Sequence, residues 1–326
     1  MKTPLALLLL LTTALTACSR SAEPSHSLEV ATRTVHTGAL SADGQWAVVG
    51  SALHGGSLWY LPAHERRYDW NHQPGDFTLL QASAISPEGQ WAATSDGQEV
   101  VLWSIDSGEA SGFWRMTSSI RQLELGRHGN VVALALEDGR AALYDVRGGN
   151  FLTSFLHRGP VNSIAVTDDL SLTISGGDDN RARVWHSNSG AAVSEMIYTD
   201  PVQRVAISAN GNRALAAARY DSVDIFDPRT GELHWRLPFP EERTRRGLTI
   251  SSAGFSEDGD YLLTGRPDGV VQLWNIPEQR EVYRWQLSGR KAWQPVSTIV
   301  MDVGFSIDPN EYFALSSDGF VHTLSY

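Results

Sequence analysis

The sequence predicts an all-β fold assembled from seven repeats of one four-stranded unit. Three regular spacings support this prediction. A small residue closes the first strand of each unit, a large apolar residue follows 17 or 18 positions later, and in six units another follows 11 positions after that. Because a single unit cannot bury its own apolar face, the units must pack against one another.

The three sets of residues mark the first, third and fourth strand of each unit. We expect the last set to pack between neighbouring sheets. The first set is Ser41, Ser86, Gly126, Thr167, Ser208, Ser256 and Ser306. The second is Trp59, Trp103, Tyr144, Trp185, Phe226, Trp274 and Leu324. The third is Trp70, Trp114, Phe155, Met196, Leu237 and Trp285.

The fourth unit carries the most specific motif. Its residues 175–185 read SGGDDNRARVW, and His157 lies in the loop before them. This pattern resembles a WD40 repeat, and the resemblance implies a seven-bladed β-propeller over residues 28–326. It also implies a structural hydrogen-bonded chain from Asp179 through His157 and Ser175 to Trp185. Only this unit shows the full set, although Asp138, Asp268 and Asp318 keep the turn aspartate.

The same residue types invite a comparison with a Ser-His-Asp hydrolase. A catalytic serine needs an exposed oxygen beside an oxyanion hole. Because Ser175 is expected to be buried, we predict a structural role for this set and no enzymatic activity. An enzyme or small-ligand site in the central channel stays open as an alternative, although the sequence shows no polar position repeated across the units to build one.

The last unit predicts how the ring closes. The chain ends at Tyr326, two residues after Leu324, so the seventh unit has no fourth strand of its own. The segment around residues 25–33 precedes the first complete unit and belongs to no sheet. We therefore expect this segment to supply the missing outer strand, which removes a pair of exposed edges.

The N-terminal residues predict export and a lipid anchor. Residues 5–17 form an apolar run of 13 residues, shorter than the roughly 20 that span a membrane, so residues 1–17 are read as a signal peptide. Leu15-Thr16-Ala17-Cys18 resembles the lipobox of bacterial lipoproteins. The resemblance implies lipidation of Cys18, a short linker over residues 18–27 and, with Ser19 next, the periplasmic face of the outer membrane. A signal peptide with a chance cysteine is the alternative.

Composition excludes several classes of function. The formal net charge of −11 disfavours nucleic-acid binding. Cys18 is the single cysteine, which excludes an internal disulfide and a multi-cysteine metal site. His54, His64 and His72 fall close together in the first unit, but their spacing completes no familiar ligand pattern. We therefore predict no metal and no cofactor.

Two long connections between units predict a binding surface. Leu237 and Ser256 are 19 residues apart, and Trp285 and Ser306 are 21 apart, against 12 in three other connections. Both should open on the same face of the ring, where insertions in repeat proteins gather. The candidate binding residues in these loops are Arg243, Arg245, Arg246, Arg290, Lys291 and Trp293. Solvated loops with internal Glu–Arg pairs are the alternative.

These expectations combine into one functional hypothesis. The WD40 resemblance implies a non-enzymatic interaction scaffold, and the lipobox places it on a membrane, so the expected partner is an envelope protein or complex. A sensor of anionic lipid or polysaccharide that uses the basic loops is a second alternative.

Overall fold

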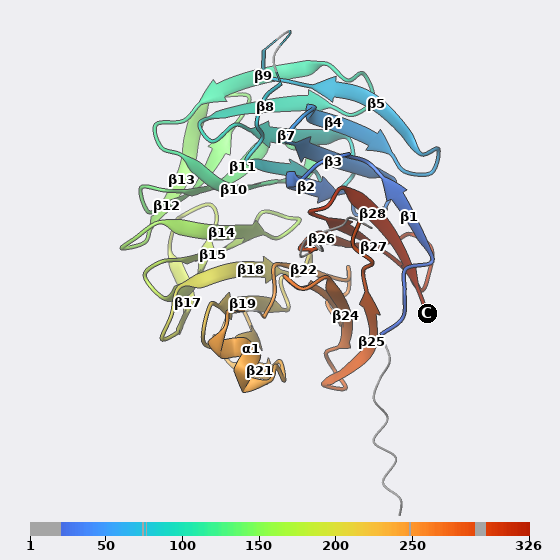
Figure 1. The fold of residues 1–326 in the computed structure, drawn as a ribbon. Coiled ribbons are helices and arrows are strands. Elements are labelled where there is room, and N and C mark those ends of the chain that lie inside the picture. The colour runs from blue at the N-terminus through green and yellow to red at the C-terminus, as the bar shows by residue number, and fades with distance from the viewer. Residues whose placement is uncertain (1–20, 74, 76, 248, 291–297) are drawn as a thin grey trace, which may run out of the picture.

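The computed structural model describes residues 21–73, 75, 77–247, 249–290 and 298–326. Seven four-stranded antiparallel sheets are arranged in a ring around a central channel (Figure 1). Six sheets are meanders in chain order, with the first strand innermost and the fourth outermost. The predicted seven-bladed β-propeller is confirmed.

The first three blades follow one another without interruption. Blade 1 contains β2 (Val35–Leu40), β3 (Trp46–Ser51), β4 (Gly55–Tyr60) and β5 (Glu65–Trp70). Blade 2 contains β6 (Ala82–Ile85), β7 (Trp91–Ser95), β8 (Glu99–Ser104) and β9 (Ala110–Arg115). Blade 3 contains β10 (Ile120–Leu125), β11 (Val131–Leu136), β12 (Arg140–Asp145) and β13 (Asn150–Leu156), with a 3₁₀ turn at Arg127–Gly129.

The next three blades repeat this plan, with one short helix in a connection. Blade 4 contains β14 (Val161–Val166), β15 (Leu172–Gly177), β16 (Arg181–His186) and β17 (Ala192–Ile197). Blade 5 contains β18 (Val202–Ile207), β19 (Ala214–Ala218), β20 (Val223–Phe226) and β21 (Leu233–Arg236), followed by α1 (Glu241–Arg245). Blade 6 contains β22 (Ser252–Phe255), β23 (Tyr261–Gly265), β24 (Val270–Asn275) and β25 (Arg280–Gln286).

Blade 7 joins the two ends of the described chain. Its inner strands are β26 (Val300–Phe305), β27 (Glu311–Ser316) and β28 (Phe320–Ser325), and its outer strand is β1 (His26–Glu29). β1 pairs antiparallel with β28, His26 opposite Thr323 and Glu29 opposite Phe320, and Figure 1 shows the two strands side by side. The predicted closure by the N-terminal segment is confirmed.

The segment before β1 is also attached to the ring. Ala22 forms a parallel bridge with Trp285 of blade 6, where its N–H donates to the Arg284 carbonyl at 2.9 Å. Ser25 N–H then donates to the Thr323 carbonyl at 2.9 Å. Part of the range read as a linker, residues 18–27, therefore lies along the outer edge of blades 6 and 7.

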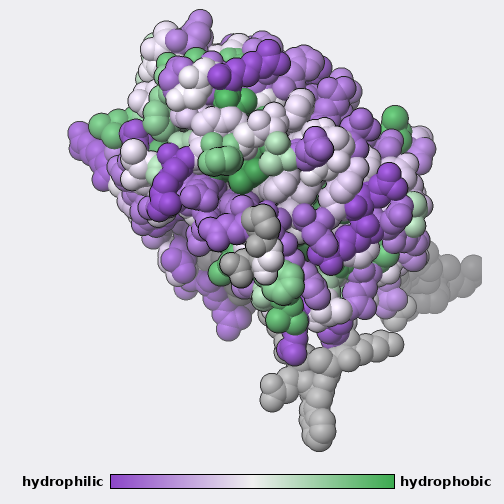
Figure 2. Space-filling model, turned by 90° about the horizontal axis from the view of Figure 1, so that it is seen from above, coloured by the Kyte–Doolittle hydropathy of each residue, from purple (hydrophilic) through white to green (hydrophobic). Residues whose placement is uncertain are grey.

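Aromatic side chains fill the space between neighbouring blades. Trp70 on β5 stacks on Trp103 of blade 2 with ring centroids 5.2 Å apart, and Phe155 on β13 stacks on Trp185 of blade 4 at 5.0 Å. Offset stacking at this separation adds to the stabilisation from burial. The fourth-strand residue of one blade thus packs on the third-strand residue of the next, as the spacing predicts. The outer surface is different in character, mainly hydrophilic with small separate hydrophobic patches on the side seen in Figure 2.

Blade 5 deviates slightly from the predicted spacing. Its expected fourth-strand residue, Leu237, is buried but follows the end of β21 by one residue. Trp235, two positions earlier, makes the aromatic contact instead, edge-on against Trp274 of blade 6 at 5.6 Å. The spacing therefore locates the contact between the blades but misses the residue that forms its aromatic part.

Removal of β1 tests the closure. A chain that begins at Val30 loses the hydrogen bonds of the β1–β28 ladder, at about 1 kcal/mol each, so we expect its free energy of unfolding to fall by roughly 3 to 5 kcal/mol. Urea unfolding measures this difference, with a chain that begins at Ser21 as the control. Equal stability of the two chains would contradict the role of β1 in holding the ring closed.

Candidate functional site

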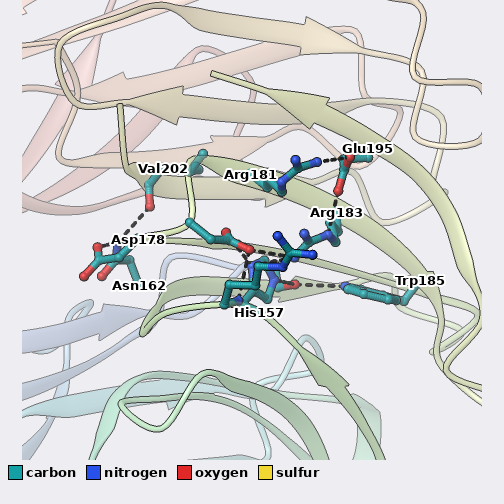
Figure 3. Close-up of polar contacts among 11 residues, drawn as sticks. His157, Asn162, Asp178, Arg181, Arg183, Trp185, Glu195 and Val202 are labelled. Atoms are coloured by element: carbon teal, nitrogen blue, oxygen red, sulfur yellow. Dashed lines mark hydrogen bonds and ion pairs between the residues drawn. The ribbon is translucent and has the colours of Figure 1, made fainter. Parts of the chain in front are cut away.

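Blade 4 contains a buried chain of polar side chains (Figure 3). His157 contacts Ser175 Oγ through Nε2 at 2.8 Å and Asp179 Oδ1 through Nδ1 at 2.9 Å. Trp185 Nε1–H donates to the same Ser175 Oγ at 2.9 Å. The structure therefore brings together all four residues of the set that the WD40 resemblance implies.

The turn and its neighbouring strands hold the carboxylate of Asp179 in place. Arg183 on β16 donates to Asp179 Oδ2 at 2.8 Å and to Glu195 on β17 at 2.7 Å. Burial alone would raise the pKa of Asp179, but hydrogen bonds from His157, Arg183 and the Arg158 backbone lower it below its usual range. Burial lowers the pKa of His157, partly offset by Asp179.

This arrangement lacks the exposed nucleophile of a serine hydrolase. Ser175 has no exposed surface, and its hydroxyl contacts both the Trp185 indole and His157. A substrate carbonyl would have to displace these contacts inside a packed blade. The geometry supports a structural role, because it satisfies buried polar groups that would otherwise destabilise the fold.

In two further blades a histidine side chain contacts a hydroxyl group, and the sequence spacing missed both contacts. In blade 2, His72 Nε2 contacts Thr94 Oγ1 at 3.0 Å, and Trp103 Nε1–H donates to that oxygen at 2.8 Å. Blade 2 thus repeats the histidine, hydroxyl and tryptophan contacts of blade 4 but not the contact to the aspartate, since Asp96 Oδ2 lies 4.0 Å from His72 Nδ1. The loop before blade 2 is four residues longer than the loop before blade 4, which hid the correspondence.

In blade 7 the histidine comes from the third strand. His322 contacts Ser316 Oγ at 3.1 Å through Nε2 and Ser27 Oγ of β1 at 2.8 Å through Nδ1. Its side chain is fully buried, and burial lowers its pKa to about 4, with Asp318 acting in the opposite direction. Neutral His322 therefore connects β27, β28 and the N-terminal strand.

Two arginines of the first predicted basic loop form ion pairs. Arg243 donates to Asp268 at 2.6 Å, and Arg245 pairs with Glu241 one helical turn away at 2.6 Å. Arg246 ends α1 as its C-cap residue. Lys291 and Trp293 lie outside the described residues. Arg245 forms an internal Glu–Arg pair, as the alternative of solvated loops expects, whereas Arg243 pairs with Asp268 in the β23–β24 turn of blade 6.

Arg290 has a specific structural partner set. Its guanidinium donates to Glu29 at 2.9 Å, to the Ala31 carbonyl at 2.8 Å and to the Asp318 carbonyl at 3.1 Å. It also lies 5.0 Å from the centroid of the Phe320 ring. These contacts attach the N-terminal segment to blade 7, so Arg290 takes part in ring closure, a role that the sequence analysis did not foresee.

A group of exposed apolar residues lies on the face that carries the long loops. Phe77 is 70% exposed, Leu79 53% and Leu53 48%. The His54 and Phe77 rings meet edge-on at 6.4 Å, which brings the β3–β4 turn of blade 1 against the loop at 71–81. We call Leu53, Phe77 and Leu79 the apolar cluster. The sequence contains one signal for this cluster, because the connection that contains the loop at 71–81 is longer than most, with Trp70 and Ser86 16 residues apart.

Three charged residues with strongly shielded side chains, from three different blades, line the central channel. The cavity has a volume of about 1400 Å³, and Glu124 of β10, Arg204 of β18 and Asp302 of β26 line it. Burial raises the pKa of Glu124 to about 7 and that of Asp302 to about 6, while Arg204 lowers both in part. Arg204 and Asp302 share one repeat position, four residues before the small residue that closes their strand, and this position is polar in six of the seven units. The expectation of no repeated polar position was therefore wrong.

Some polar side chains of the innermost strands link neighbouring blades. Gln122 accepts from Ile164 N–H at 2.6 Å and Ser163 accepts from Val205 N–H at 3.1 Å. Asp302 accepts from Leu40 N–H at 2.8 Å. Each of these three residues lies four positions before the small residue that closes the first strand of its unit. They accept hydrogen bonds from backbone N–H groups of the next innermost strand, as buried N–H groups require.

Comparison with known proteins supports the WD40-repeat family. Residues 149–186, from β13 of blade 3 to β16 of blade 4, and residues 243–275, from α1 to β24 of blade 6, match the family model described as WD domain, G-beta repeat. Within the described residues, no helix is long and apolar enough to cross a membrane.

The chain is similar to several proteins of eukaryotes. It is 27% identical to eukaryotic translation initiation factor 3 subunit I of Candida albicans, over 63% of this chain and 62% of that protein. It is 27% identical to COMPASS component SWD3 of Saccharomyces cerevisiae, over 59% and 62%. It is 28% identical to autophagy-related protein 16 of Arabidopsis thaliana, over 57% and 36%.

The chain thus spans about three fifths of the length of the first two relatives. Their names describe a subunit and a component of larger assemblies, which is consistent with a non-enzymatic propeller. Because these relatives are eukaryotic, they lend no support to the predicted bacterial lipoprotein, and Cys18 lies outside the described residues.

The buried state of His322 predicts a pH dependence of stability. Its pKa is about 4 in the folded chain and about 6.5 when unfolded, so the unfolded state binds more protons between these values and stability falls as the pH falls. Protonation of His322 in the unfolded state should lower the free energy of unfolding by about 2 kcal/mol between pH 6.5 and 5. Urea unfolding at both pH values should show a smaller loss for His322→Asn, whereas the exposed His186→Asn control should keep the wild-type loss. An unchanged loss in His322→Asn would contradict this assignment.

Proposed function

We propose that this chain is a membrane-anchored scaffold that binds a protein partner through the face carrying its long loops. The relatives named as a subunit and a component support the general role of a WD40 propeller in protein assemblies. The observation that carries the proposal for this chain is the apolar cluster of Leu53, Phe77 and Leu79, which leaves three large side chains about half to two thirds exposed.

The topology supports the choice of this face. In an antiparallel meander, the connections between blades and the turns between second and third strands open on the same side of the ring. The loop at 71–81 and the turn between β3 and β4 are of these two kinds, and so are the connections at 237–251 and 287–299. Exposed aromatic residues in such positions anchor interfaces more often than charged side chains that are already paired.

The anchor is the second part of the proposal. Lipidation of Cys18 would hold the chain at the periplasmic face of an outer membrane, where the partner would be an envelope protein or complex. Ala22 is bonded to blade 6, so four residue steps separate Cys18 from the folded body. At roughly 3.5 Å per residue, this is a reach of about 14 Å, less than the linker length expected from sequence. The propeller would therefore lie close to the membrane.

The alternatives have weaker support. A sensor of anionic lipid would need free cations, yet three of the four described candidate arginines, Arg243, Arg245 and Arg290, are paired with carboxylates. A small ligand in the channel would use Glu124, Arg204 and Asp302, which do converge from three blades. However, Asp302 and Glu124 already accept backbone hydrogen bonds from Leu40 and Val166, and these contacts explain both residues as structural.

Substitution in the apolar cluster tests the binding face. Crosslinking in cells followed by mass spectrometry identifies the partner, and its affinity is then measured for Leu53→Ser with Phe77→Ser. We expect binding to weaken by at least about 30-fold, because loss of even one central apolar anchor removes about 2 kcal/mol. Phe113→Ser on β9 is the matched control, since Phe113 is 77% exposed but lies on an outermost strand. Equal loss in both variants, or no loss in the first, would contradict the proposed face.

Two variants test the anchor in a Gram-negative host. We expect the wild-type chain in the outer-membrane fraction with an acylated Cys18 at its mature N-terminus, whereas Cys18→Ser should not be acylated. Ser19→Asp is the matched control, because the lipobox resemblance implies that it stays acylated but is retained in the inner membrane. Fractionation and intact mass measure both properties. A wild-type chain whose N-terminus is another residue, without acyl chains, would refute the anchor.

A further inference from the structure

His72 has one ring nitrogen whose environment the fold does not explain. The side chain is only 3% exposed, and Nε2 contacts Thr94 Oγ1 at 3.0 Å, in the same way that His157 contacts Ser175 in blade 4. Nδ1 of His157 meets Asp179 at 2.9 Å, but Nδ1 of His72 has no hydrogen-bond partner. Its nearest carboxylate oxygen is Asp96 Oδ2, at 4.0 Å. A buried polar atom without a partner is costly and calls for an explanation.

The difference between the two blades comes from the length of one turn. Trp185 follows Ser175 by ten residues, whereas Trp103 follows Thr94 by nine. Asp96 comes two residues after Thr94, and its Oδ1 accepts from the backbone N–H groups of Gln98 at 3.1 Å and Glu99 at 2.8 Å. These hydrogen bonds hold the carboxylate in the shorter turn. Its other oxygen, Oδ2, therefore lies 4.0 Å from His72 Nδ1, too far for a hydrogen bond.

The charges around the two histidines also differ. Counting back from each tryptophan, Glu99 of blade 2 takes the position of Arg181 in blade 4, and Val101 takes the position of Arg183. His157 therefore faces one carboxylate that Arg183 neutralises at 2.8 Å. His72 faces two carboxylates, with Arg115 3.2 Å from the second but 70% exposed to solvent.

We propose that His72 Nδ1, Asp96 and Glu99 bind a divalent metal ion, with Zn²⁺ as the best fit. One ligand atom from each residue lies within 4.8 Å of the other two, and within the described residues this is the one such group of three or more. One imidazole nitrogen and two carboxylate oxygens suit Zn²⁺, which takes three protein ligands and water in open sites. Zinc ligands lie about 3.3 Å apart, so rotation of the Asp96 and Glu99 side chains closes the site.

The neighbouring contacts prepare the site for a metal. Thr94 Oγ1 can accept both the Trp103 indole N–H and His72 Nε2–H, which leaves Nδ1 as the free lone pair. Histidine ligands generally donate their other N–H to such an oxygen, and this contact fixes the ring. Asp96 and Glu99 are 36% and 32% exposed, so an ion can enter from solvent. Bound metal would connect the loop at 71–81 to the β7–β8 turn of blade 2.

A competing surface site must be separated from this one. The rings of His26 and His64 are stacked with centroids 4.9 Å apart, and both side chains are exposed. Such a pair can bind zinc weakly without a built site. His26→Gln removes it without touching blade 2, so this variant belongs in every measurement.

Zinc titration of the untagged mature chain tests the proposal. After treatment with a chelator, we expect calorimetry with Zn²⁺ alone to show one site per chain with a dissociation constant in the micromolar range or below. Asp96→Asn and Glu99→Gln should each weaken binding about tenfold or more, while they keep His72, Thr94 and Trp103. His26→Gln and the blade 4 variant Asp179→Asn should bind zinc as the wild type does.

Three results would overturn the proposal. The first is no zinc uptake by the wild-type chain, and the second is unchanged affinity in both Asp96→Asn and Glu99→Gln. The third is loss of the site in His26→Gln, which would assign the zinc to the surface pair. A Co²⁺ titration adds a readout independent of stability. The visible absorption bands of Co²⁺ report metal bound to protein ligands, and these bands should be lost with Glu99→Gln.

Discussion

The pairing of β1 with β28 is the interaction on which the ring depends. Blade 7 has three strands without it, and β28 would expose a row of unpaired N–H and C=O groups. Two other contacts reach the same segment: His322 binds Ser27, and Arg290 binds Glu29 and the Ala31 carbonyl. Backbone pairing, a buried imidazole and a guanidinium thus all hold one short stretch of chain. Residues 26–31 are therefore part of the propeller.

Once the ring is closed, its blades hold together through two layers of contact. Near the outside, stacked aromatic rings such as Trp70 on Trp103 exclude water between sheets. Along the innermost strands, Gln122, Ser163 and Asp302 accept hydrogen bonds from backbone N–H groups of the next innermost strand. The inner edge of each blade would otherwise leave donors unsatisfied in a narrow space. Gln122 and Asp302 of the channel therefore have a structural explanation before any ligand is considered.

The sequence predicted the blades well because the hairpins within a blade fix the spacing between its strands. Trp185 and the other third-strand residues fall at nearly constant intervals for this reason. Contacts that depend on variable loops were missed. Four extra residues before blade 2 hid the match between His72 and His157, and the role of Arg290 depends on Glu29, 261 positions away. Trp235 occupies a position that no repeat spacing marks, whereas Arg204 and Asp302 share a repeated position that the comparison of the units overlooked.

Blades 2 and 4 show how one structural element can acquire a different chemistry. Both place a histidine between a hydroxyl and a carboxylate under a tryptophan, and both bury the imidazole. In blade 4, Asp179 and Arg183 complete the set, so each polar group has a partner in the fold. In blade 2, a turn one residue shorter and a glutamate in place of an arginine leave a lone nitrogen beside two carboxylates. Departures from a local rule tend to coincide with function, because the fold alone gives no reason to keep them. The contrast within one chain separates what the propeller needs from what blade 2 adds to it.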